Sequence, residues 1–502
     1  LREAIAYASN GCVSTIPGYE GKIVITFAPG IAELILNNKE NDLGFTYEEL
    51  RIGTALAGKT VSIDASIKED GSEDEHREVT VKVPVTYQES LENQTTASDY
   101  RVLQVGEDYN DFSNWDIVLK NMSFKGGDIP STDQGGHGGT LYMRGATNNL
   151  TLDHSKISES RATYGGGVYA WAETDSTVTL IESTLSNNYA QDGAGLYNAT
   201  KHLTNSNSTV HVTNSTIANN TATRYGGGIY NDSHITQNNS SIANSNVYVV
   251  SSTITGNTAA NQGGGIFNET NHAYTSTRTN NNVHLVNSIV FGNYKGNEGN
   301  DVRFSGAHED KNTFHVAYSI YGDSNVDPSS TSFEATQYNT TAKDINRIFA
   351  EVNANNIPQL SADGRTVVIQ RTGEAAIKGT LAGKLGNDYY YYNMSAGKWI
   401  SFSNGERYAF VADNATHYGL TEANKDTTIY RLAQNVDENN VHRARVHGDN
   451  DIPVYRYFNM GAYELDGERE RPSIHVTTED DIINISDGLI SLREALVYAA
   501  NG

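Results

Sequence analysis

Seven segments between about Asp116 and Asp323 repeat one spacing of apolar residues, and this repetition limits the possible folds more than any other feature. When the segments are aligned on Ser215, apolar or aromatic side chains stand five and three residues before it and two residues after it. The first two positions have the period of a strand with one buried face, whereas the third is out of phase, so we expect a bend near the aligned position. The aligned positions are Met122, Ser155, Ser183, Ser215, Ser252, Ser288 and Ser319.

Strands of one repeated pattern are buried most economically when each turn of the chain lies on the turn before it, because equivalent side chains then form inward ladders. A thin core of this kind also suits a chain with 37% hydrophobic residues and 46 glycines. We therefore predict an all-β fold, a right-handed parallel β-helix of the pectate-lyase-like solenoid class, with a short N-terminal amphipathic capping helix.

Glycine-rich runs follow the strands and predict the corners of the coils, because glycine permits positive φ and close backbone approach. The distance from the aligned position to the glycine run is nearly constant, whereas the segment after the run lengthens along the chain and is rich in Asn, Thr and Ser. One side of the solenoid should thus be fixed, and the other should carry loops that lengthen along the axis. The variable side is either a binding face or a solvated fringe. The runs begin at Gly138, Gly165, Gly193, Gly226 and Gly263.

Side chains of one type recur once per coil and predict two further ladders. An asparagine stands five residues after the aligned position in four coils, where stacked amides would bond to one another. An aromatic residue follows each glycine run and predicts a structural ring stack. His211 and His284 occupy an outward position whose equivalents are Thr and Tyr, which argues against a metal site. The two ladders are Asn188, Asn220, Asn257 and Asn293, and Tyr142, Tyr169, Tyr197, Tyr230 and Phe267.

The two ends of the chain match each other. Residues 1–11 and 492–502 are identical at eight of eleven positions, which indicates a tandem repeat of 491 residues. In the second copy, Ser491 and Glu494 form the pattern of a capping box, so a short helix should open each repeat. We expect four parts: a capping helix and first coils over 1–105, regular glycine-rich coils over 106–345, final coils with an inserted Tyr-rich subdomain over 346–472, and the start of the next repeat over 473–502.

The charge and composition exclude several functions. A formal net charge of −24 argues against nucleic acid, which is bound through clustered Lys and Arg. Cys12 is the only cysteine, so no disulfide framework or thiolate metal site is expected. The chain contains no apolar run of the length that spans a membrane. A polyanionic surface is compatible with a structural Ca²⁺ ion, but no cofactor is required.

Candidate site residues are acidic or aromatic. A loop with Asp108, Asp111 and Asp116 is a possible Ca²⁺ or polysaccharide-processing site, although its spacing does not match an EF-hand. The run Glu69, Asp70, Glu73, Asp74 and Glu75 is better explained as a solvated loop. The run Tyr389–Tyr392 is a possible carbohydrate-binding face. We expect no acidic residues on adjacent coils with a partnering Lys or Arg, and we assign no catalytic residue.

Several motifs resemble those of large bacterial surface proteins that fold as parallel β-helices. That family has a (Cys)-Ser-Leu-Arg-Glu-Ala opening motif, matched here by Ser491–Ala495 with Ile490 in place of the cysteine, which removes any disulfide there. Its Ile-Thr-Phe and Ile-Asp strands are matched at Ile25–Phe27 and Ile63-Asp64, and its closing Gly-Ala-Tyr-Glu at Gly461–Glu464. The Gly-Gly-Gly-Ile-Tyr-Asn coils are similar to those of polymorphic outer-membrane adhesins.

This resemblance implies an extracellular or cell-surface location and a structural or adhesive role, as one unit of a giant bacterial surface or filament protein. Its expected partners are neighbouring copies of the repeat, end to end, and surface glycans or host and partner cells. We therefore expect no enzyme. The alternative is a polysaccharide lyase or hydrolase, or a carbohydrate-binding β-helix, because parallel β-helices also carry such activities. Fold by itself does not decide between them.

Overall fold

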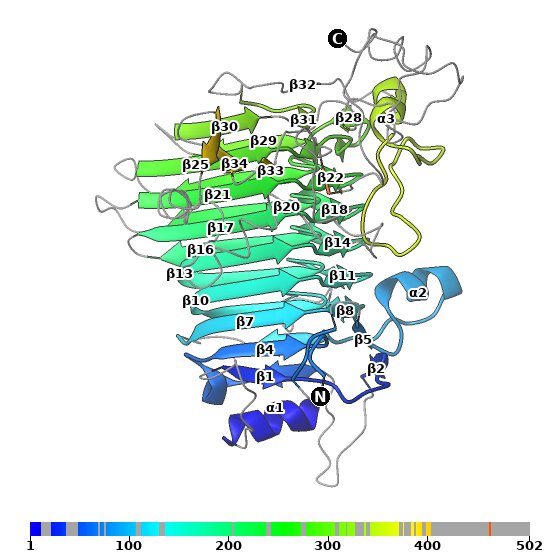
Figure 1. The fold of residues 1–502 in the computed structure, drawn as a ribbon, viewed down its shortest axis with the longest axis vertical. Coiled ribbons are helices and arrows are strands. Elements are labelled where there is room, and N and C mark those ends of the chain that lie inside the picture. The colour runs from blue at the N-terminus through cyan, green and yellow to red at the C-terminus, as the bar shows by residue number, and fades with distance from the viewer. Residues whose placement is uncertain are drawn as a thin grey trace.

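The computed structural model shows a stack of coils that rises from the N-terminal helix at one end (Figure 1). The structure describes residues 1–11, 22–36, 49–68, 71–74, 77–106, 112–129, 136–202, 205–236, 242–272, 278–306, 311–317, 319–326, 336–337, 342–370, 375, 383–385, 388–393, 398–402 and 461–462. Within these residues nearly all strand pairs are parallel, and in the three large sheets nearly every strand pairs with its equivalent one coil away. The predicted parallel β-helix is confirmed.

The largest sheet, here called the main sheet, contains 15 strands and is folded into two arms. Strands β10 (Leu141–Asp153) and β13 (Val168–Ile181) run through both arms, with a register shift between Gly145 and Thr147. The first arm adds β3 (Leu50–Ile52), β6 (Leu103–Val105), β16 (Leu196–His202), β20 (Ile229–Ile235), β24 (Ile266–His272) and β29 (Val302–Gly306). The second arm adds β1 (Ile23–Ile25), β4 (Thr60–Asp64), β7 (Asn114–Lys120), β17 (Ser206–Thr213), β21 (Ile242–Val250), β25 (Arg278–Val286) and β30 (Lys311–Ala317).

Two further sheets complete each coil. The ten-stranded side sheet contains β2 (Glu33–Ile35), β5 (Val79–Lys82), β8 (Met122–Lys125), β11 (Lys156–Ser158), β14 (Thr184–Ser186), β18 (Thr216–Ala218), β22 (Thr253–Thr255), β26 (Ile289–Val290), β31 (Ile320–Tyr321) and β32 (Thr336–Gln337). The seven-stranded corner sheet contains β9 (Asp128–Ile129), β12 (Arg161–Ala162), β15 (Tyr189–Asp192), β19 (Thr221–Tyr225), β23 (Thr258–Ala259), β27 (Tyr294–Lys295) and β28 (Glu298–Gly299). In these two sheets, β28 is the one strand antiparallel to its neighbour.

The repeated apolar positions form the core. All of them are buried, and those of the coil around Ser215 are Val210, Val212 and Ile217, each 0% exposed. The expected bend lies at the residue before the aligned position, which has positive φ in six coils, for example 48° at Asn214. The aligned serine secures the bend, because the backbone N–H of Ser183 donates to Ser215 Oγ at 3.0 Å in the next coil. The same bond joins successive serines from Ser155 to Ser319.

The asparagine ladder is confirmed at the next corner. Asn188 Nδ2 donates to Asn220 Oδ1 at 3.0 Å, and Asn220 Nδ2 donates to Asn257 Oδ1 at 2.9 Å. The ladder continues through Asn293 and ends on Asp301 Oδ1 at 2.8 Å. Burial raises the pKa of the Asp301 carboxyl to about 7, while the bonds from Asn293 oppose this rise. The ladder satisfies backbone groups that would otherwise be buried without partners.

A second amide ladder, which the sequence did not lead us to predict, lies between the two arms. Asn198 Nδ2 donates to Asn231 Oδ1 at 2.9 Å, and Asn231 Nδ2 donates to Asn268 Oδ1 at 3.0 Å. These three side chains are 0% exposed, and each follows the glycine run at the same distance. Polar side chains thus fill the space where the arms converge. The intervals that lengthen along the chain were expected to be loops, and this expectation is wrong: within the described residues they are formed largely by the strands of the two arms.

The part of the chain that the structure describes includes three α-helices, which flank the coils (Figure 1). The predicted capping helix is α1 (Arg2–Ser9), whose Ile5 and Ala8 are buried against the end of the main core. Helix α2 (Tyr87–Asn93) starts with a capping box between Thr86 and Glu89. Helix α3 (Ala342–Ile348) packs on the outer face of the side sheet. A short 3-10 turn, η1, spans Thr54–Leu56.

The expected division of the chain at 105, 345 and 472 stays a prediction, and most of residues 346–472 and all of 473–502 lie outside the described residues.

Residues 349–370, here called the strap, add no coil to the stack. They form local antiparallel bridges and lie along the outside of the side sheet, where Thr184 Oγ1 and Thr216 Oγ1 bond to residues 365 and 366. Gly461 and Ala462, from the closing motif, bond to the same face at Asn287 and Thr253.

Candidate functional site

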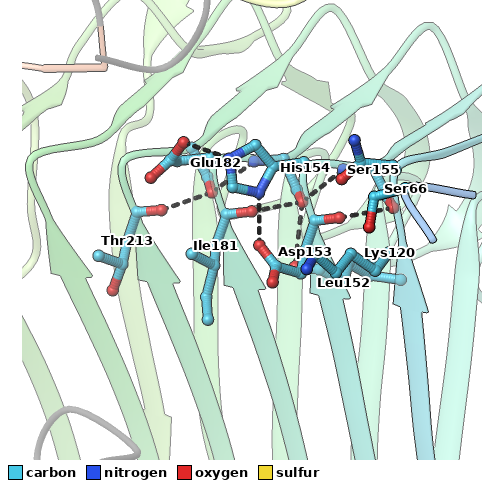
Figure 2. Close-up of polar contacts among 12 residues, drawn as sticks. Ser66, Lys120, Leu152, Asp153, His154, Ser155, Ile181, Glu182 and Thr213 are labelled. Atoms are coloured by element: carbon cyan, nitrogen blue, oxygen red, sulfur yellow. Dashed lines mark hydrogen bonds and ion pairs between the residues drawn. The ribbon is translucent and has the colours of Figure 1, made fainter. Parts of the chain in front are cut away.

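A row of acidic and basic side chains lies at the bend between the main sheet and the side sheet (Figure 2). Asp64, Lys120 and Asp153 are in register on the adjacent strands β4, β7 and β10. Lys120 Nζ is 4.0 Å from Asp64 Oδ2 and 3.0 Å from Glu73 Oε2. Our expectation of no acidic residues flanking a basic one on adjacent coils is therefore wrong. Lys120 and Asp153 both stand two residues before an aligned position, so the alignment of the repeats already pairs them, whereas Asp64 and Glu73 precede the aligned segments and meet Lys120 only in the folded chain.

The surroundings of this row determine which of its side chains are charged. Burial raises the pKa of Asp64, although Ser66 donates to its Oδ1 from both its backbone N–H at 2.8 Å and its hydroxyl at 2.6 Å. Burial favours neutral Lys120, but the charges of Asp64, Asp153 and Glu73 outweigh it and raise the pKa of Lys120. Lys120 thus stays an ammonium ion that pairs with Asp64 of the coil below and Glu73 of the neighbouring loop, while the charge of Asp153 in the coil above stabilises its charged form.

His154 extends the row by one coil. Its Nδ1 is 2.6 Å from Asp153 Oδ1 and its Nε2 is 2.7 Å from Glu182 Oε2. Burial lowers the pKa of His154, but the charges of Glu182 and Asp153 outweigh burial and raise that pKa to about 9. The imidazolium therefore uses both ring nitrogens to join two coils. A histidine held in this way fixes the bend; neither nitrogen is left to take a proton from a substrate.

The strap is attached beside this row. Arg365, which is 7% exposed, pairs with Glu78 and donates from Nη1 to the carbonyl of His154 at 3.4 Å. Lys156 Nζ donates to the carbonyl of Asp363 at 2.6 Å. Further along the solenoid, the strap and α3 cover apolar outward residues of the side sheet, among them Ile289, Phe291 and Ile320. The strap is therefore held by charged contacts around Asp363 and Arg365, and by apolar contacts further along the solenoid.

Two more basic residues bridge adjacent coils at the corner sheet. Arg161 binds Asp128 through two nitrogens, at 2.6 and 2.7 Å, and also lies over the ring of Tyr87 from α2. Arg224 forms the equivalent pair with Asp192. A bidentate pair of this geometry fixes the relative position of two coils more tightly than a single contact does.

The predicted acidic sites are only partly described. Asp116 accepts a hydrogen bond from Thr60 Oγ1 at 2.5 Å, whereas Asp108 and Asp111 lie outside the described residues. Glu73 pairs with Lys120 and Asp74 with Lys68, whereas Glu69, Asp70 and Glu75 lie outside. The described ranges contain no group of three or more His, Cys, Asp or Glu side chains arranged for a metal ion. Bound Ca²⁺ stays a prediction.

The predicted aromatic stack is confirmed on the outer side of the first arm. Its rings are stacked at centroid distances of 4.8 to 5.6 Å, from Tyr142 to Phe267. A second outward stack runs along the second arm through His211, Tyr248, His284 and His315, at 4.7 to 5.1 Å. In both rows the ring faces contact one another, so the faces contribute to coil stacking.

The Tyr-rich run lies in a separate antiparallel sheet. It is formed by β33 (Gly383–Leu385), β34 (Asp388–Asn393) and β35 (Lys398–Phe402). Strand β34 contains Tyr389–Tyr392 and pairs with both neighbours. Its role in carbohydrate binding stays a prediction.

A buried acid and a half-buried acid also lie on the outer side of the first arm. Asp232 and Glu269 are in register on β20 and β24, and the hydroxyl of Tyr230 donates to Glu269 Oε2 at 2.5 Å. Burial, followed by the charge of Glu269, raises the pKa of Asp232 well above its usual value. Each of these acids directly follows a residue of the second amide ladder, so the alignment of the repeats already pairs them, although the flanking coils have Ala199 and Ser305 at this position.

A comparison with known protein families finds a similarity at two coils of the solenoid. The family model of the Chlamydia polymorphic membrane protein repeat matches residues 214–232 and 251–269. Each match runs from the bend at the aligned serine, through the asparagine ladder and the glycine corner, into the first arm. No curated protein and no solved structure matches the chain. Within the described residues, no helix has the length and apolarity needed to cross a membrane. Two consecutive coils of this solenoid are thus similar to the repeat of Chlamydia polymorphic membrane proteins.

Proposed function

We propose that the chain is a structural and adhesive segment of a bacterial cell-surface or secreted filament protein. The observation that carries this proposal is the match of two consecutive coils to a repeat of bacterial membrane proteins. The architecture supports it, because coils that contact only their neighbours build an elongated body with a regular side surface. The ladders of serine, asparagine and aromatic rings join coil to coil, which suits a load-bearing rod.

We further propose that neighbouring copies of the unit stack end to end. A parallel β-helix ends in strands whose backbone groups have no partner on one side, and such edges associate with other strands unless they are covered. In the described residues the first strands of the main and side sheets, β1 and β2, each pair on one edge only. The matching segments at 1–11 and 492–502 supply a repeated cap between units.

Electron microscopy of the native full-length protein tests both statements. Long threads with an axial period set by one unit are the expected result. Isolated short rods on cells and in solution would contradict the filament, and a screen for cleavage of polysaccharides would then test the enzymatic alternative.

Deletion of residues 473–502 tests the end-to-end contact separately. The shortened chain is expected to melt at a lower temperature or to aggregate through its exposed end, as measured by scanning calorimetry and light scattering. An unchanged melting temperature together with monodisperse protein would contradict the proposed contact.

A further inference from the structure

Lys120 and Asp64 lie opposite each other on adjacent coils and carry the amine and the carboxyl from which an amide bond is made. The two residues are in register on β7 and β4, and Lys120 Nζ is 4.0 Å from Asp64 Oδ2. A charged hydrogen bond between such atoms is shorter, at about 2.8 Å. The two groups are therefore held as close neighbours at the bend, and a bond between them would join the two coils covalently.

The two oxygens of the Asp64 carboxyl have different surroundings. Oδ1 accepts hydrogen bonds from the backbone N–H of Ser66 at 2.8 Å and from the Ser66 hydroxyl at 2.6 Å, whereas Oδ2 faces Lys120. When an amine attacks a carboxyl carbon, negative charge develops on one oxygen, and donors that are already in place stabilise it. Ser66 supplies two such donors to Oδ1. Oδ2 is then the oxygen that leaves.

Glu73 places a proton acceptor at the amine. Its Oε2 is 3.0 Å from Lys120 Nζ, which is the distance that a general base needs. The Glu73 side chain is 41% exposed, whereas those of Lys120 and Asp64 are 17% and 3% exposed. The carboxyl held by Ser66 is thus the buried reactant, and the exposed carboxylate is the group that moves protons.

The buried position of Asp64 favours the reaction. Burial raises the pKa of Asp64 and so favours its uncharged carboxyl, which is the form that an amine attacks. Lys120 is an ammonium ion before the reaction, but each molecule reacts only once, so a small fraction of neutral amine is enough. Groups fixed side by side react as if at an effective concentration of about 10⁵ M or more, which offsets the cost of forming an amide in water.

We propose that Lys120 and Asp64 are joined by an isopeptide bond that forms within the folded chain. Glu73 first moves one proton from the ammonium to Oδ2, which leaves the amine and the carboxyl neutral. The lone pair of Nζ attacks Cγ of Asp64, and the negative charge goes to Oδ1, where Ser66 stabilises it. Glu73 moves a second proton from the nitrogen to Oδ2, the Cγ–Oδ2 bond breaks, and water leaves. One ammonium and one carboxylate thus give one amide and one water, without any other reactant.

This bond goes beyond the proposed function, because it forms whether or not units stack end to end. It ties the coil of β4 to the coil of β7, close to the capping helix, where the core has few coils beneath it. It also replaces two buried charges, whose desolvation is costly, by one neutral amide. Failure of the bond and failure of the filament are therefore separate results.

The mass of the purified full chain under denaturing conditions tests the proposal. The chain is expected to be about 18 Da lighter than its sequence, which is the mass of one water molecule. Lys120→Arg keeps the positive charge but has no reactive amine, so this variant should have its full sequence mass. Lys125→Arg is the matched control, because Lys125 forms an ion pair with Glu159 at 3.0 Å and should not react. This control should lack one water, as the wild type does.

A tryptic digest of the wild type locates the bond without any variant that must fold. Trypsin cuts after Lys and Arg but not after a lysine whose amine is in an amide. Digestion should therefore release one branched peptide, in which residues 60–68 are joined to residues 102–125 with no cut after Lys120. Tandem mass spectrometry of this peptide should assign the linkage to Asp64.

Glu73→Gln tests the proton transfer. The bond should form about a hundredfold more slowly in this variant, as is typical when a general base is removed. The rate is measured by mass spectrometry at intervals after cell-free synthesis of the full chain. Equal rates in E73Q and the wild type would overturn the role of Glu73.

Three results would overturn the isopeptide bond itself. The first is a wild-type chain that keeps its full sequence mass after prolonged incubation at neutral pH. The second is a loss of water that persists in K120R, since the lost water would then come from another site. The third is a branched peptide that contains residues 69–77 in place of 60–68, because the carboxyl partner would then be an acid of that segment and not Asp64.

Discussion

At the scale of single residues, the bends of the coil depend on polar side chains that are fully buried. A buried amide or hydroxyl is costly unless every group finds a partner, and here each ladder residue finds its partner one coil away. The free-energy cost of a buried polar group without a partner explains why the same residue type recurs at the same position. Asn220, for example, accepts from Asn188 and donates to both Asn257 and the carbonyl of Leu185.

The His154 ion cluster predicts a loss of stability at alkaline pH. The pKa of His154 is raised from 6.5 to about 9 in the folded protein, so its contribution is fully present below pH 6.5 and is lost as pH rises towards 9. The difference between these two pKa values corresponds to a contribution of about 3 kcal/mol to the free energy of unfolding. Melting curves between pH 6 and 10 should show this decline, and NMR of labelled histidine should give a titration midpoint near 9.

The variant H154N provides the comparison. It leaves the carboxylates of Asp153 and Glu182 buried without the imidazolium, so it should melt at a lower temperature than the wild type at pH 6 and lose most of the decline between pH 6.5 and 9. A histidine that titrates near its ordinary pKa, with the same pH dependence of melting in both proteins, would show that the cluster is not charged as described.

At the scale of elements, the strap explains why the outer face of the side sheet changes character along the solenoid. Outward residues are polar near Lys156 and Thr184, and apolar at Ile289 and Ile320. The strap follows this change, with Arg365 over the polar coils and Val367 and Ile369 over the apolar ones. Its charged end is therefore the end that a single substitution can release.

Replacement of Arg365 by Met is expected to release the polar end of the strap. The change removes the partner of Glu78 and a donor to the carbonyl of His154, at a cost of about 1–3 kcal/mol. Hydrogen exchange should become faster at residues 361–366 and on β11 and β14, with little change in distant coils. Arg51→Met is the control, because the Arg51 side chain is 57% exposed and its partner Glu49 keeps a second ion pair with Arg101, so the loss of Arg51 should cost little. Equal exchange rates in R365M and the wild type would contradict the contact.

At the scale of the whole molecule, helix α1 closes one end of the stack. Ile5 and Ala8 are 3% and 5% exposed and belong to the same apolar cluster as the strands of the first coils. Tyr7, on the opposite side of the helix, is 60% exposed. The helix thus shields the apolar interior at the end where β1 begins the main sheet.

Substitution of Ile5 by Asp should open this end. Burying a carboxylate there costs several kcal/mol, so the helix detaches and the first coils gain an exposed apolar edge. We expect a lower melting temperature and concentration-dependent aggregation in light scattering, whereas Tyr7→Ser, on the exposed side of the same helix, should behave as the wild type. If I5D stays monodisperse and melts like Y7S, α1 does not act as a cap.

The sequence alone determined the fold of the coils, because each coil repeats the same apolar positions, glycine corner and ladder residue, and only stacking of equivalent positions buries them all. It also determined the asparagine ladder, the aromatic stack and the capping helix, whose patterns are local. The tertiary structure alone decided which charged residues outside the repeated pattern meet this row. Asp64 and Glu73 contact Lys120 although both precede the aligned segments, and Arg365 reaches Glu78 and His154 because the chain returns along the side sheet. Such contacts join residues with no common period, and so no repeat in the sequence marks them.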